Sequence, residues 1–174
     1  SASEITRTSP VHGCFTTEQR AIYDIVLEAQ EAAFAQIAPG KHWNDAHEAA
    51  VRAITRGLRD AGLLKGNLRT LIRDGAYRPF FMHRTGHWLG MDVHDVGDYK
   101  VSDHWRLLEP GMTLTVEPGI YIAPGMRKVP KRWQGIGVRI EDDVAVTRDG
   151  YELLTRGLPR TADEVEAAVG TMAG

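Results

Sequence analysis

The sequence predicts an α+β domain, in which two helices come first and a mainly antiparallel sheet follows. Apolar residues recur at helical spacing before Gly62, whereas short β-branched runs separated by turn signals dominate after Gly75. A chain of 174 residues, with 43% hydrophobic and 25% charged side chains, suits one globular domain over residues 1–174. No internal repeat or low-complexity linker divides it.

The first helix is predicted behind a capping box, Thr16-Thr17-Glu18-Gln19, because a hydroxyl is followed three residues later by an amide side chain. Pro39-Gly40 ends this helix. A second helix is predicted over residues 44–61, with Gly62 closing it. The apolar positions of the first helix are Ile22, Ile25, Val26, Ala29, Ala33 and Ile37.

Two apolar, β-branched runs after the helices are predicted as strands. The first covers residues 112–122 and is interrupted by Pro118-Gly119, and the second covers residues 138–146. Pro-Gly and Asp-Gly pairs between the runs are turn signals. A short terminal helix is predicted behind a cap at residues 161–164, and it ends near Gly170.

The composition argues against several classes of partner. A formal net charge of −2 gives no positive surface for nucleic acid or an anionic membrane. The single cysteine, Cys14, cannot form an internal disulfide, and no apolar stretch is long enough to cross a bilayer. The first residues lack a signal-peptide pattern. We therefore expect a cytoplasmic protein without a nucleic-acid or membrane partner.

Three histidines, His83, His87 and His94, stand among bulky apolar residues in the segment 80–95. His83 and His87 have the spacing of a helical zinc pair, but the neighbouring glycines oppose a helix and no glutamate follows His83. Each histidine alone is explained as a hydrogen-bonded core residue. The three together favour a functional site.

Carboxylates in the predicted strands are costly to bury unless a cation neutralises them. Glu117 either is such a residue or points to solvent before the Pro-Gly turn. Strand alternation places Arg139 and Glu141 on one face, either as a surface ion pair or as a ligand with its orienting arginine. Imidazole and carboxylate ligands together suit manganese, zinc, cobalt or iron(II).

These segments carry a resemblance to a known family. Residues 83–95, 115–119 and 138–143, preceded by the stretch 5–13, resemble the aminopeptidase P and prolidase branch of the pita-bread metallopeptidases. The resemblance covers nearly the whole chain in the right order. It implies the C-terminal catalytic part of a pita-bread fold, with two helices followed by a curved sheet.

For the metal site, the resemblance implies that His87 and Glu117 ligate one ion and that Glu141 bridges two. Family members usually hold two manganese ions, which zinc or cobalt can replace. Glu4 stands at the position of the family's second aspartate ligand and is a candidate ligand here. The family's first aspartate and its N-terminal domain precede this part of the fold, so we expect one ion or none on this chain.

For the reaction, the resemblance implies that His94 stabilises charge beside the scissile bond, that His83 places substrate, and that Arg139 orients Glu141. A metal-bound hydroxide would attack the carbonyl before a proline residue. Glu117 would carry the proton to the leaving nitrogen. The implied activity is removal of the N-terminal residue from Xaa-Pro peptides.

Other functions stay open. A prolidase would cleave Xaa-Pro dipeptides only, and a pita-bread binding module would recognise partners without catalysis. A purely structural α+β domain is the third alternative, and it would require every one of these motifs to have arisen by chance. Part of a pita-bread fold would expose a sheet edge and a core face. That predicts a homo-oligomer, or pairing with the missing part of the fold, and leaves the activity of this chain alone open.

Overall fold

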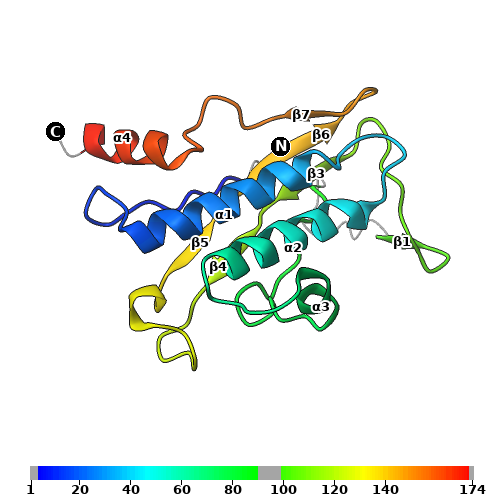
Figure 1. Cartoon of the computed structure of the whole chain (residues 1–174). Helices are drawn as coiled ribbons and strands as arrows, with labels where there is room; N and C mark the ends of the chain where they lie inside the picture. Colours follow the sequence, from blue (N-terminus) through cyan, green and yellow to red (C-terminus); the bar gives the residue numbers. More distant parts are fainter. Residues whose placement is uncertain (1–3, 90–98, 173–174) are drawn as a thin grey trace.

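The computed structural model describes residues 4–89 and 99–172, and it confirms the α+β fold (Figure 1). In this part of the chain, no helix has the length and apolar character needed to cross a membrane. The helices are α1 (Thr17–Phe34), α2 (Trp43–Asp60), α3 (Leu68–Arg73) and α4 (Ala162–Met172). The strands are β1 (Lys100–Val101), β2 (His104–Trp105), β3 (Thr113–Val116), β4 (Gly119–Tyr121), β5 (Gly137–Arg139), β6 (Asp142–Val146) and β7 (Tyr151–Leu153).

The predicted helices are present with small changes at their ends. The capping box of α1 is confirmed, since Thr16 Oγ1 accepts from Gln19 N at 3.1 Å and Gln19 Oε1 accepts from Thr16 N at 2.9 Å. This helix ends at Phe34, and i→i+3 turns lead on to Ile37. The second helix, α2, begins at Trp43. The terminal helix α4 is also confirmed.

The two predicted strand runs pair with each other in antiparallel register. Strand β3 pairs with β6 from Thr113↔Ala145 to Val116↔Asp142, and β4 pairs with β5 from Gly119↔Arg139 to Tyr121↔Gly137. The ladder is interrupted at one level, at residues 117–118 on one run and 140–141 on the other. Pro118 contributes to this break because it has no N–H to donate.

Two further segments flank this pair, one on each side. Residues 85–89 bond along β3, where Thr115 N donates to His87 O at 2.8 Å. Residues 4–8 lie beside the other run, where Thr6 N donates to Glu141 O at 3.2 Å and Glu141 N donates to Thr6 O at 3.0 Å. Four segments that are distant in sequence therefore lie side by side.

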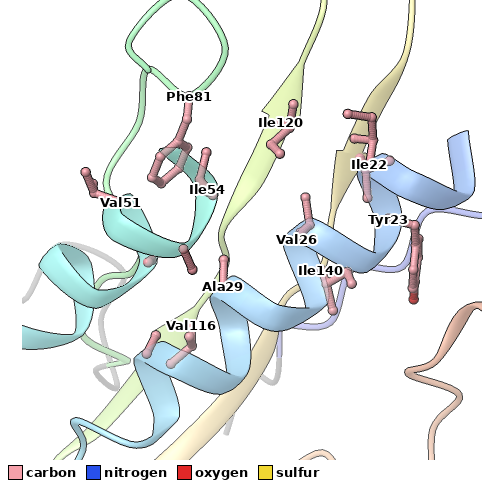
Figure 2. Close-up of a cluster of buried hydrophobic side chains, with 14 of the residues drawn as sticks. Ile22, Tyr23, Val26, Ala29, Val51, Ile54, Phe81, Val116, Ile120 and Ile140 are labelled. Atoms are coloured by element: carbon pink, nitrogen blue, oxygen red, sulfur yellow. The ribbon is translucent and has the colours of Figure 1, made fainter. Parts of the chain in front are cut away.

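The hydrophobic core lies between the sheet and the first two helices, which pack against each other (Figure 1). Figure 2 shows side chains of α1 and α2 meeting those of the strands. Because successive strand residues point to opposite faces, Val116 and Ile140 face this core while their neighbours Glu117 and Glu141 face away from it. The labelled core residues are Ile22, Tyr23, Val26, Ala29, Val51, Ile54, Phe81, Val116, Ile120 and Ile140.

Candidate metal centre

Four side chains predicted as metal ligands meet on the sheet face opposite the helices, and each comes from a different one of the four adjacent segments. His87 Nε2 lies 3.1 Å from Glu4 Oε2 and 3.7 Å from Glu117 Oε1. Glu4, His87 and Glu141 each offer a ligand atom, and these atoms all lie within 4.8 Å of one another. The structure thus brings together one imidazole and three carboxylates.

Two contacts with Thr115 of β3 hold the backbone of His87 in place. Its N–H donates to Thr115 Oγ1 at 3.0 Å, and its carbonyl accepts from Thr115 N at 2.8 Å. Ring atom Nδ1 lies 3.0 Å from the Trp88 carbonyl oxygen. That contact assigns the proton of the neutral ring to Nδ1 and leaves Nε2 to face the carboxylates, the arrangement of a metal-binding histidine.

Neighbouring side chains also position two of the carboxylates. The hydroxyl of Thr6 donates to Glu141 Oε2, and Glu141 is almost fully buried. The backbone N–H of Glu4 donates to Asp143 Oδ2 at 2.8 Å. Glu4 is therefore held through its backbone, by a residue on the same strand face as Glu141.

The electrostatics of this cluster favour a bound cation. Burial, followed by the charge of Glu141 and a hydrogen bond with it, raises the pKa of Glu117 to about 7. Burial alone would lower the pKa of His87, but the Trp88 carbonyl and the nearby carboxylates outweigh it and raise the pKa. Burial also raises the pKa of Asp143. Each carboxylate makes ionisation of its neighbours costlier, and a cation would relieve this.

The donor set fits a divalent transition metal. Mixed imidazole and carboxylate ligands suit manganese, zinc, cobalt and iron(II), whereas calcium and magnesium prefer oxygen-only shells. A further observation is Asp143 Oδ1, which is buried and has no hydrogen-bond partner among the described residues. Glu4, His87, Glu117 and Glu141 are the residues that would hold the ion.

The residues predicted to act on substrate lie partly beside this centre. His83 Nε2 is 2.9 Å from Tyr121 Oη, and His83 Nδ1 is 2.7 Å from the Arg84 carbonyl oxygen. Arg139 lines the same cavity as His83. Its role in orienting Glu141 stays a prediction, because no ion pair within 4 Å joins these two described side chains. His94 lies outside the described residues.

Tyr121 is a site residue that the sequence reasoning missed. Burial raises the pKa of its hydroxyl, and Arg139 partly opposes this effect. Strand alternation counted from Glu117 through Gly119 to Tyr121 was the available signal, since it places all three on one face. Because Pro118-Gly119 is a turn signal, the sequence did not show that the alternation continues past it.

An open cavity of about 850 Å³ adjoins the centre. This volume is within the range of ligand pockets, roughly 300–1,000 Å³. His87 and Glu117 line one part of it, and the β1–β2 hairpin lines another. Its described lining residues are Trp43, His83, Arg84, Gly86, His87, Tyr99, Lys100, Trp105, Glu117 and Arg139.

Known proteins are similar to this chain in sequence and fold. The family model described as metallopeptidase family M24 matches residues 1–148. The Xaa-Pro aminopeptidase of Escherichia coli (strain K12) is 51% identical over 166 residues, covering 95% of this chain and 37% of that protein. Xaa-Pro aminopeptidase 2 of Streptomyces coelicolor is 49% identical over 173 residues, covering 99% of this chain and 37% of that protein. The structure of Pseudomonas aeruginosa aminopeptidase PepP aligns with a TM-score of 0.96 at 62% identity, covering 99% of this chain and 39% of that protein.

The chain thus spans between 37% and 39% of the length of these relatives. The likeness confirms the expected resemblance to the aminopeptidase P branch and the C-terminal part of its fold. The four converging candidate ligands fit the metal dependence that the family's description names. The family match covers most of the residues, and this chain belongs to metallopeptidase family M24.

Proposed function

We propose that the polypeptide carrying this sequence is a metal-dependent aminopeptidase that releases the N-terminal residue from peptides with proline in the second position. The convergence of His87, Glu117, Glu141 and Glu4 from four segments carries this proposal. The names of the most similar proteins, Xaa-Pro aminopeptidases at about half identity, supply the substrate class.

Manganese is the ion that we propose, with zinc and cobalt as substitutes; a zinc-substituted form of E. coli aminopeptidase P has been solved with product. When bound, such an ion would lower the pKa of a coordinated water and polarise the substrate carbonyl. The ligands proposed are those of the cluster, with Glu4 nearest to His87 Nε2.

The chain's own residues supply proton transfer and substrate placement. Glu117, a carboxylate that lines the cavity beside His87, is positioned to carry a proton to the leaving proline nitrogen. His83 lines the cavity and is backed by Tyr121, with ring centroids 5.5 Å apart, so its ring offers a surface for the proline ring. Arg139 adds a positive charge to the same wall.

A prolidase is the second candidate. Its dipeptide substrates would need room for one residue beyond the scissile bond, whereas this cavity continues from His87 to Trp105 on the hairpin. That extent favours longer peptides. A substrate complex of a variant E. coli aminopeptidase P supports a peptide as the binding partner. Self-association, or pairing with another part of the fold, and a cytoplasmic location stay predictions.

The test uses the full polypeptide in which this sequence occurs, loaded with manganese. We expect metal retained in elemental analysis and cleavage of a tripeptide with proline second. His87→Ala should lose both, and the exposed His12→Ala should keep both. Cleavage of Xaa-Pro dipeptides alone would favour the prolidase. Metal retention without any hydrolysis would favour a binding module and refute the proposed activity.

A further inference from the structure

We infer that the cavity contains a subsite for a carboxylate of the substrate, formed by Arg84 and Lys100, which both contact the ring of Trp105. This inference rests on the proposed function. It adds a preference among Xaa-Pro peptides for those that carry a negative charge downstream of the proline, as a C-terminal carboxylate or an acidic side chain.

The two cations are held against one indole ring. The guanidinium carbon of Arg84 lies 4.9 Å from the centroid of Trp105, and Lys100 Nζ lies 4.5 Å from it. Lys100 and Trp105 are register partners in the β1–β2 pair. Arg84 also donates to Asn44 Oδ1 of α2, so both the hairpin and a helix fix this arrangement.

The positive charge at this place has no close ion-pair partner among the described residues, and Glu48 acts on Arg84 only from a longer distance. Residues 4–89 and 99–172 contain no carboxylate within 4.0 Å of the Arg84 or Lys100 nitrogen atoms. Contact with an aromatic face attracts a cation but does not remove its charge. The cations therefore keep the capacity to bind an anion, and a guanidinium is well shaped to bind a carboxylate through two hydrogen bonds.

The distribution of charge along the cavity gives a peptide its direction. Beside the metal centre, Arg139 and a bound cation would offset the charge of Glu117 and the other carboxylates, whereas Arg84 and Lys100 make the hairpin part positive. A short peptide carries an ammonium group at its N-terminus and a carboxylate at its C-terminus. Electrostatic complementarity therefore favours the carboxylate end of a bound peptide near Trp105.

Aromatic residues complete this part of the wall. Trp43 and Tyr99 line the cavity together with Trp105. The ring centroids of Trp43 and Tyr99 are 4.9 Å apart. Such rings exclude water from one side of a bound group and strengthen its electrostatic contacts. A carboxylate here would thus be bound by two nearby cations and beside an apolar surface.

The test compares matched peptides on the full, manganese-loaded polypeptide. One pair is an Xaa-Pro-Ala tripeptide with a free carboxylate or a C-terminal amide. The other is an amidated Xaa-Pro-Ala-Glu or Xaa-Pro-Ala-Gln peptide. Within a pair, we expect kcat/KM to be about 3- to 10-fold higher for the charged peptide than for its neutral partner, mainly because KM is lower. This difference should become smaller at high salt. The first pair detects a terminal carboxylate and the second an acidic side chain.

Combined Arg84→Gln and Lys100→Gln substitutions should bring the charged-to-neutral ratio close to one. The matched control combines Lys65→Gln with Arg148→Gln, which are exposed and do not line this cavity, and it should keep the ratio. A ratio of one in the unaltered protein, or one that survives the cavity substitutions, would overturn the subsite while leaving the peptidase activity intact.

A complete absence of hydrolysis would refute the proposed function and not the subsite. Calorimetric titration of the same peptides then decides the inference. Tighter binding of the charged members, lost with the cavity substitutions, supports the subsite. Equal binding of charged and neutral members overturns it.

Discussion

Replacing Gly86 with alanine tests whether close backbone packing sets the position of His87. A Cβ atom built at Gly86 would lie 2.0 Å from the carbonyl oxygen of Thr115, a separation that real Cβ atoms do not show. The obstacle is backbone, so no side-chain rotation can relieve it. The segments around Gly86 and Thr115 would have to separate by roughly 1 Å.

The structure gives an estimate of the cost. The separation acts on the bond from Thr115 N to His87 O and on the bond from His87 N to Thr115 Oγ1. Two weakened hydrogen bonds at about 1 kcal/mol each, with about 1–3 kcal/mol for the overpacking, predict a loss of about 3–5 kcal/mol in unfolding free energy. Displacement of the imidazole should weaken manganese binding about 10- to 100-fold.

Gly137→Ala is the matched control, because it makes the same chemical change in β5 near the site. Its Cβ would meet only Tyr121 Cδ1, at an ordinary contact distance of 3.6 Å. Urea unfolding would measure stability, and titration calorimetry would measure manganese affinity. If Gly86→Ala matches Gly137→Ala in both measurements, the close contact does not position His87 and the reasoning is wrong.

Two further predictions concern buried polar groups. Burial, with Arg84 and His83, lowers the pKa of His47 to about 4, and the unfolded value is about 6.5. The unfolded chain therefore binds the extra proton first, so about 2–3 kcal/mol of stability is lost as pH falls from 6.5 toward 4. Urea unfolding between pH 6.5 and 4 should show a smaller loss of stability in His47→Gln than in the unaltered protein. An equal loss in the two proteins would contradict this. Asp142→Asn should cost about 3–5 kcal/mol, because it leaves Arg7 without its buried partner 2.7 Å away; an unchanged urea midpoint would contradict that.

Much of the fold could be predicted from local signals. The capping box at Thr16 and the helical spacing behind it identify α1, and the β-branched runs identify the β3–β6 and β4–β5 pairs. Helix α3 has six residues, and the hairpin strands have two each. Such short elements do not establish a period, so no sequence pattern revealed them.

The candidate site was predictable as residues but not as a geometry. Glu117 and Glu141 were singled out because a carboxylate in an apolar strand is costly to bury, and the resemblance added Glu4. Their convergence depends on the register of four segments, and a slip of one residue would turn each side chain to the opposite face. Asp143 was missed because sequence does not reveal that its carboxylate holds the Glu4 backbone.

The ligand segment and the hydrophobic core are fixed by the same strand. Asp142 faces the helices, where Gln30 of α1 donates to it at 2.8 Å, while its neighbours Glu141 and Asp143 face the metal centre. Neighbouring residues of the segment 4–8 reach both sides, because the Thr6 hydroxyl donates to Glu141 Oε2 and Arg7 donates to Asp142 Oδ1 at 2.7 Å. The segment 4–8 is therefore anchored on both faces of the sheet. A change that loosens the helix side at Asp142 should also move Glu141, a proposed metal ligand, so we expect stability and metal affinity to change together.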